Sequence, residues 1–157
     1  MTATMTALRS IVIERRLPHA PEKVWRALTE TELIGQWLMP NDFRPVVGHR
    51  FSFKAKTKPV GDWDGIVHCE VVACEPNRLL RYSWVGGAAS NKTYGSLLDS
   101  TVTWTLTPVD GGTHLRMEHA GFRSPENDFA YDAMSPGWGH LVERLEQVVA
   151  ALGQGHG

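Results

Sequence analysis

The sequence predicts an α+β fold in which a curved antiparallel sheet of about six or seven strands wraps around one long C-terminal helix. Apolar and polar residues alternate in an N-terminal run, "SIVIERRL", and in five or six further runs between Phe43 and about His119. Turn and loop signals such as "PVVG", "EPN" and "PVDGG" separate these runs. Near the C-terminus, apolar residues recur at the spacing of an amphipathic helix.

A single compact domain is the expected organisation of the chain. Its 157 residues are enough to bury most of the surface that the unfolded chain would expose. We therefore expect one domain over residues 1–157, with a core from about residue 9 to residue 152.

Two short helices are expected after the first strand, which should end near Pro18. Pro21 suits the first turn of a helix because its fixed φ angle is already helical. Thr29 or Thr31 could cap the second helix through a side-chain oxygen. Apolar residues at helical spacing then continue through both helices: Val24, Trp25, Ala27, Leu28, Leu33, Ile34 and Trp37.

Alternation in the later strands defines one apolar face and one polar face of the sheet. Polar and charged residues such as Arg50, Glu70, Arg81, Thr103 and Arg116 occupy the outer face. The inner face is expected to carry Phe51, Phe53, Val67, Cys69, Val71, Leu80, Tyr82, Trp84, Val102, Trp104, Leu106, Leu115 and Met117. The C-terminal helix can cover this face with Trp138, Leu141, Val142, Leu145, Val149 and Leu152.

Composition excludes several classes of function. Sixteen basic and seventeen acidic residues give a net charge of -1, and no basic stripe suggests nucleic acid as a partner. No apolar run has the length of a signal peptide or a membrane span, so we expect a cytoplasmic protein without a membrane partner. Cys69 and Cys74 lie five residues apart in one predicted strand, too far for a disulfide.

Five segments in order resemble the START/SRPBCC superfamily, whose helix-grip fold is also that of the birch-pollen allergen. Within it, the chain is similar to the branch named after the activator of the heat-shock-protein-ninety ATPase. The segments are "APEKVWRALTETELIGQWLMP" (20–40), "VGHRFSFKA" (47–55), "EPNRLLRYSW" (75–84), "VTWTLTPVDGGTHLRMEHAGF" (102–122) and "GWGHLVERLEQVV" (137–149). The resemblance implies a helix-grip domain with a ligand cavity between the sheet and the helix, and no single reaction.

The expected binding surface is therefore the concave apolar face itself. An apolar or aromatic small molecule would contact Phe51, Phe53, Tyr82, Trp84, Trp104, Met117, His119, Trp138 and Leu141. For each aromatic residue taken singly, filling the core is the more common role.

Two alternatives to simple binding remain open from the sequence. His119 continues the inner-face alternation and could act as a general base with Tyr82 as its partner, as in an aromatic cyclase or a hydrolase; a satisfied core histidine is the more common role. A co-chaperone-like interaction module, with a role in the stress response, is the second alternative that the resemblance implies.

Other kinds of site find little support. We expect no catalytic residues, no cofactor and no metal: His114 and His119 should point to opposite faces of one strand, and Asp62 and Asp64 lack a third ligand. The loops "KTKPVGDWDG" and "WVGGAASNKTYGSLLDS" are long enough to be lids, so Trp63 and Tyr94 could close over a cavity or meet a second subunit of a homodimer.

Overall fold

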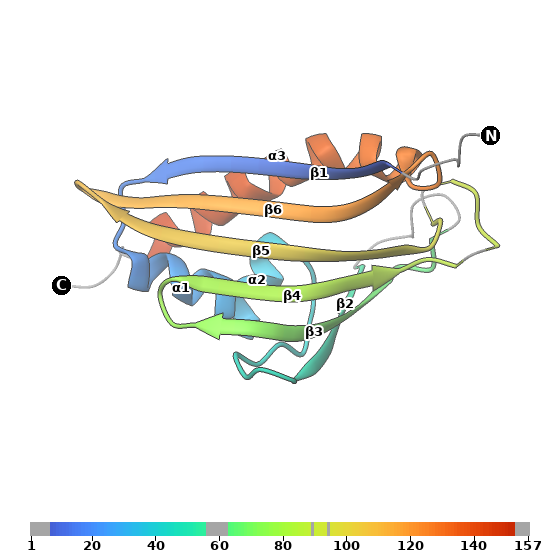
Figure 1. The fold of residues 1–157 in the computed structure, drawn as a ribbon. Helices are drawn as coiled ribbons and strands as arrows, with labels where there is room; N and C mark the ends of the chain where they lie inside the picture. The colour runs from blue at the N-terminus through green and yellow to red at the C-terminus, as the bar shows by residue number, and fades with distance from the viewer. Residues whose placement is uncertain (1–6, 56–62, 89, 94, 153–157) are drawn as a thin grey trace.

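The computed structural model describes residues 7–55, 63–88, 90–93 and 95–152, and it shows one antiparallel sheet covered on one face by helices (Figure 1). The elements in chain order are β1 (Ala7–Leu17), α1 (Pro21–Thr29), α2 (Thr31–Trp37), β2 (Arg50–Lys54), β3 (Ile66–Glu75), β4 (Leu79–Gly86), β5 (Leu98–Val109), β6 (Gly112–Ser124) and α3 (Asp128–Leu152). The sheet has six strands in the order β1-β6-β5-β4-β3-β2. The predicted α+β helix-grip architecture is confirmed.

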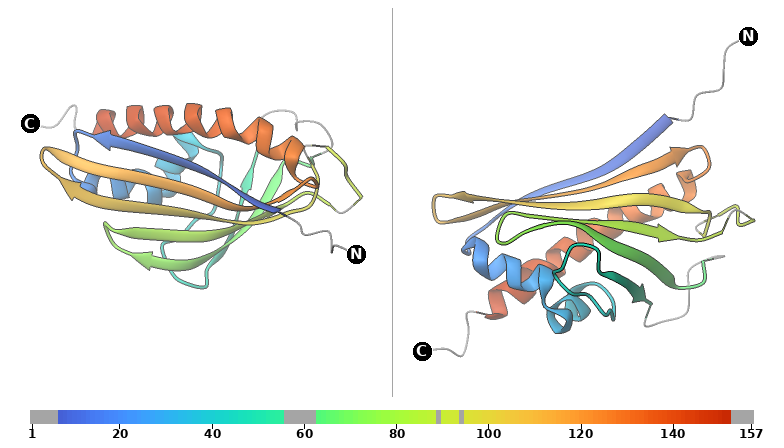
Figure 2. Two further views of the ribbon diagram at one scale, coloured as in Figure 1. Left: turned by 45° about the horizontal axis from the view of Figure 1, so that its top comes forward. Right: turned by 60° about the horizontal axis from the view of Figure 1, so that its bottom comes forward.

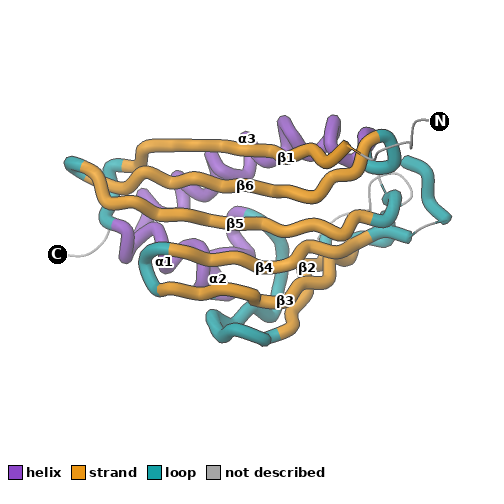
Figure 3. Tube along the Cα trace, in the orientation of Figure 1, coloured by secondary structure: helices purple, strands orange, loops and turns teal. Residues whose placement is uncertain are grey.

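All three helices lie on one side of the sheet (Figure 3). Strand residues alternate accordingly: Trp104 and Met117 are fully buried under the helices, while Arg81 on β4 is exposed. On the edge strand β1, Ile11 is buried and its neighbour Val12 is 44% exposed. The alternation that predicts the strands therefore also predicts which face they bury.

Helices α1 and α2 pack against each other and against α3 on the covered side of the sheet (Figure 3). Pro21 begins α1 as expected, and Trp37 at the end of α2 donates from Nε1 to the Ala27 carbonyl at 2.8 Å. The predicted threonine cap of α2 is wrong, because Glu30 holds the cap position without a side-chain hydrogen bond. Thr29 instead donates to the Trp25 carbonyl, and Thr31 donates to the Phe43 carbonyl.

The turn between β5 and β6 requires glycine because another strand passes close to it. A Cβ atom on Gly112 would lie 1.9 Å from the Leu17 carbonyl oxygen at the end of β1. Gly111 beside it has φ 76°, a conformation that glycine adopts without strain. This pair lets the long strands β5 and β6 turn tightly against β1.

Helix α3 runs along the concave face of the sheet (Figure 2). It begins at Asp128, ten residues before the predicted apolar stripe starts at Trp138, and it contains Pro136. Trp138, Val142, Leu145 and Val149 are buried as predicted, whereas Leu141 and Leu152 are half-buried. The sequence signal missed the first part of α3 because Pro136 and Gly137 are typical of a helix boundary.

Two further features concern the cysteines and membrane spans. Cys69 and Cys74 are both free thiols, as expected. Within the described residues, no helix combines the length and the apolar composition that crossing a bilayer requires.

Truncation of one buried side chain of α3 tests which face of the helix packs against the sheet. Leu145 has no exposed surface, so Leu145→Ala should lower the free energy of unfolding by roughly 2–5 kcal/mol in urea melts. The exposed Gln147, two residues away on α3, is the matched control. Gln147→Ala should change stability by no more than about 0.5 kcal/mol, and equal losses in both variants would contradict this orientation.

Candidate functional site

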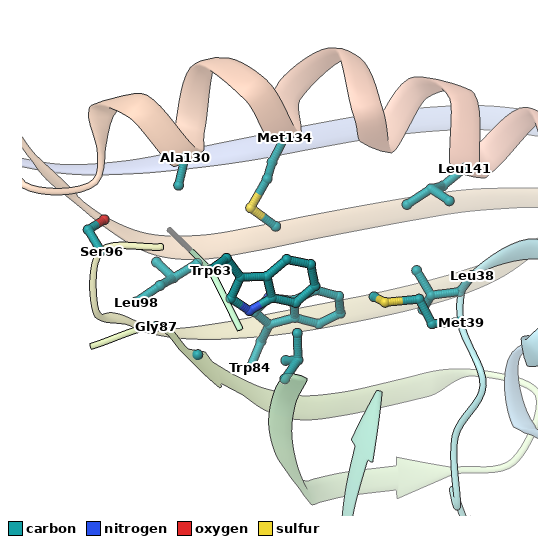
Figure 4. A pocket seen from close by; sticks show the side chains of 12 residues that line it. Leu38, Met39, Trp63, Trp84, Gly87, Ser96, Leu98, Ala130, Met134 and Leu141 are labelled. Atoms are coloured by element: carbon teal, nitrogen blue, oxygen red, sulfur yellow. The ribbon is translucent and has the colours of Figure 1, made fainter. Parts of the chain in front are cut away.

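A cavity of about 210 Å³ lies between the concave sheet face and the N-terminal half of α3 (Figure 4). Four elements and three connecting segments supply its walls, and none of its described lining residues carries a charge. The lining residues are Leu38, Met39, Trp63, Val67, Trp84, Gly86, Gly87, Ser96, Leu98, Ala130, Met134 and Leu141.

A second apolar cavity of about 110 Å³ adjoins the first. Five lining residues are common to both: Leu38, Met39, Trp84, Met134 and Leu141. Ala133, Gly137 and Trp138 complete its wall. Methionine side chains are flexible and adapt to the shape of a neighbour, so movement of Met39 or Met134 can join the two spaces. Each cavity is below the ~300–1,000 Å³ of typical ligand pockets.

Gly87, directly after β4, allows the Ser96 backbone to pass close to it at the cavity wall. A Cβ atom on Gly87 would lie 2.3 Å from the Ser96 carbonyl oxygen, and one on Gly86 would lie 3.6 Å from Trp63 Nε1. Trp63 donates from that nitrogen to the Ile66 carbonyl at 3.1 Å. The indole of Trp63 is therefore anchored at the cavity wall.

The predicted site residues fall into two groups. Trp84 and Leu141 line both cavities, and Trp138 lines the second. The other six lie in the buried core, outside the described cavity walls: Phe51, Phe53, Tyr82, Trp104, Met117 and His119. Trp138 connects the groups, because its ring centre lies 5.6 Å from that of Trp84 and 5.9 Å from that of Trp104.

His119 is the centre of a hydrogen-bonded chain beneath these rings. Trp138 Nε1 donates to His119 Nδ1 at 3.0 Å, His119 Nε2 lies 2.7 Å from Ser100 Oγ, and Ser100 Oγ donates to the Trp84 carbonyl at 2.7 Å. Because an indole nitrogen only donates, His119 Nδ1 carries no proton. The neutral ring protonated on Nε2 then donates to Ser100, and every group in the chain is satisfied.

Burial opposes charge on both polar residues of the inner face. Desolvation lowers the pKa of His119 to about 3 and raises the pKa of Tyr82 above its usual value, against a smaller opposing effect of the Trp104 hydrogen bond. The Tyr82 hydroxyl accepts from Trp104 Nε1 at 3.0 Å. His119 and Tyr82 therefore bond to different partners, and both nitrogens of His119 are already engaged.

Several cavity residues have no clear signal in the sequence. Ala130 and Met134 lie before Pro136, where no helix is expected, and Met39 follows the predicted end of α2. Trp63 lies at the cavity wall, as one of the two lid residues suggested by loop length, while Tyr94 is outside the described residues. Val67 is detectable only as an inner-face residue of a strand, and Leu98, which the sequence places in the loop "WVGGAASNKTYGSLLDS", instead begins β5.

No metal centre is seen in the described part of the chain, where no three His, Cys, Asp or Glu side chains form a group that could hold an ion. Asp62 lies outside the described residues.

A concave sheet, one long helix and an apolar cavity between them define the class of helix-grip domains. The family described as "Activator of Hsp90 ATPase homolog 1-like protein" matches residues 18–150, and the chain belongs to this family. The resemblance found in the sequence motifs is therefore confirmed.

Solved structures with the same fold include close and distant relatives. A Mesorhizobium loti protein is 48% identical, with a TM-score of 0.77 and a match that covers 90% of this chain and 97% of that one. A Bacillus halodurans protein is 28% identical, with a TM-score of 0.70 and coverage of 92% and 99%. The Aha1 dimer of Colwellia psychrerythraea is 19% identical, with a TM-score of 0.69 and coverage of 95% and 99%. The comparison with curated proteins gave no match.

The neutral state of His119 predicts a dependence of stability on pH. Because its folded pKa is lowered to about 3, the unfolded chain alone takes up this proton as pH falls below about 6.5. Stability contributed by His119 is present above pH 6.5 and should decline on acidification by up to about 1.4 kcal/mol per pH unit.

Urea melts at several values between pH 4 and pH 6 measure this slope. A glutamine can accept from Trp138 and donate to Ser100 without titrating, so His119→Gln should show a smaller slope than the wild type. Parallel slopes in the two proteins would show that His119 is not held neutral.

Proposed function

We propose that this domain binds a small, uncharged apolar or aromatic molecule in the two adjoining cavities beneath α3. The observation that carries the proposal is the first cavity, whose wall combines indole rings and thioethers without any charged side chain among its described residues. Apolar pockets with few polar groups are typical ligand sites. Burial of an apolar ligand there would be favoured by the hydrophobic effect.

The shared methionines support a site that adapts to its ligand. Met39 and Met134 border both cavities, and Figure 4 shows the Met134 side chain extending from α3 into the space above the tryptophans. Thioethers also make favourable contacts with aromatic rings. A ligand larger than the first cavity can therefore be accommodated by displacement of these side chains.

The enzymatic alternative has weaker support. The described cavity walls contain no His, Asp, Glu, Cys or Lys, and His119 accepts from Trp138 on the nitrogen that a general base would use. We therefore favour binding over acid–base catalysis. Pairing of two copies stays a prediction, as does a co-chaperone role.

A panel of small neutral aromatic compounds tests the proposal by thermal melting. A ligand that binds only the folded state at hundredfold excess over Kd stabilises it by about 2.7 kcal/mol. For a domain of this size, the midpoint should then rise by roughly 5–10 °C. A panel without any shift, together with unchanged protein NMR spectra, would contradict the proposal.

Two glycines of α3 provide a matched pair of cavity variants. A Cβ atom on either Gly137 or Gly139 meets nothing within 4 Å, but only Gly137 lines a cavity. Gly137→Leu should fill the second cavity. Compounds that extend into this cavity should then bind roughly tenfold or more weakly, since overpacking excludes the ligand. Gly139→Leu should leave the affinities unchanged.

Calorimetric titration measures both variants against the compounds that shift the wild type most. If Gly137→Leu binds all of them as well as Gly139→Leu does, the ligand does not use the second cavity.

A further inference from the structure

Ser96 is the one hydroxyl on the described wall of the first cavity. It is 6% exposed and lies at the end of the cavity near Ala130, away from Leu38 and Met39 (Figure 4). The second cavity shares the opposite end, through Leu38, Met39 and Leu141. A molecule that fills the site would therefore have one end at Ser96 and the other near Trp138.

The neighbouring Asn127 fixes the role of the Ser96 oxygen. Asn127 is 1% exposed, its Oδ1 accepts from the Arg123 amide at 2.9 Å, and its Nδ2 donates to the Leu97 carbonyl at 2.9 Å. These backbone partners set the orientation of the side-chain amide. The same Nδ2 donates to Ser96 Oγ at 3.0 Å, so the serine oxygen acts as an acceptor on that side.

The hydroxyl hydrogen of Ser96 is left available by this arrangement. Among the described residues, Ser96 Oγ makes no hydrogen bond in which it donates. An unused donor in an apolar wall is stabilised when a ligand brings an acceptor to it. The site thus combines an apolar body with a placed hydroxyl donor.

A second donor lies on the same wall. Four indole N–H groups donate to protein atoms: Trp37 to Ala27, Trp63 to Ile66, Trp104 to Tyr82 and Trp138 to His119. Within the described chain, Trp84 Nε1 donates to no protein atom. Every described side-chain nitrogen or oxygen that is fully shielded from solvent does have a hydrogen-bond partner. The indole nitrogen of Trp84 therefore keeps some accessible surface.

The surroundings of Ser96 also favour a polar end for the ligand. Ser96 also lines a larger and more polar cleft of about 460 Å³, to which Asp99, Arg123 and Glu126 contribute. A polar group of a ligand at Ser96 would therefore lie next to other polar groups and not in an apolar core. The chemistry of the site thus changes along its length, from a hydroxyl and a polar cleft to indoles and thioethers.

We infer that the ligand is an uncharged, ring-containing molecule with a hydrogen-bond acceptor, a carbonyl or a hydroxyl oxygen, at the end held by Ser96. Its apolar body lies against Trp63 and Trp84 and points toward the second cavity. Ser96 is then the residue that selects for the acceptor. This inference rests on the proposed function, since it orients a ligand within the same cavities.

Indane and 1-indanone test this inference because they differ by one carbonyl group. Calorimetry or protein NMR gives Kd for both compounds with the wild type and with Ser96→Ala. The variant should bind 1-indanone roughly 3- to 10-fold more weakly, as expected for loss of one neutral hydrogen bond. Its Kd for indane should stay within about twofold of the wild type, since apolar contacts are unchanged.

Ser83→Ala is the matched control, because Ser83 Oγ also accepts one hydrogen bond, from the Glu70 amide, and lies outside both cavity walls. It should bind both compounds as the wild type does. A urea melt confirms that each variant is folded under the titration conditions.

The outcomes separate the two proposals. If both compounds bind and Ser96→Ala affects them equally or not at all, the acceptor subsite is wrong while binding in the cavity stands. If neither compound binds the wild type, the acceptor subsite is wrong; if no compound of the aromatic panel binds either, the proposed function fails with it.

Discussion

One indole joins the long helix to the sheet. Trp138 of α3 packs against Trp84 of β4 and Trp104 of β5, and it donates to His119 of β6. His119 in turn bonds to Ser100 of β5, whose hydroxyl donates to the β4 backbone at Trp84. Three neighbouring strands and the helix therefore depend on one aromatic and hydrogen-bonded cluster, in which an unpaired or charged member would be costly.

The position of this cluster explains where the cavity forms. Trp138 holds α3 near its middle, and the next anchors lie at its N-terminal end. There Asp128 forms an ion pair with Arg9 at 3.1 Å, and the Tyr131 hydroxyl donates to the Ser10 carbonyl at 3.2 Å. Pro136, between the two points of attachment, cannot donate a helical hydrogen bond. The part of α3 between the anchors crosses the concave sheet, and the first cavity lies beneath it (Figure 4).

Core and pocket are two regions of one apolar face. Towards β1 and the C-terminal half of α3, side chains such as Trp104, Met117 and Leu145 are fully buried and close the interior. Under the N-terminal half of α3, residues such as Ala130 are too short to reach the tryptophans on the sheet, and Met134 is flexible. His119 stabilises the closed region, whereas Ser96, at the edge of the open region, is the residue that we propose meets a ligand.

The sequence alone determines the strands, their inward faces and the stripe from Trp138 to Val149, because alternation and helical spacing record which side of each element avoids water. It also determines that His119 points inward. It could not show that α3 begins at Asp128, because Pro136 and Gly137 are local signals of a boundary and only tertiary packing continues the helix through them. It could not separate Trp84, which lines the cavity, from Trp104, which does not, because both alternate inward in the same way. That distinction depends on the distance between α3 and the sheet at each point, which only the tertiary structure decides.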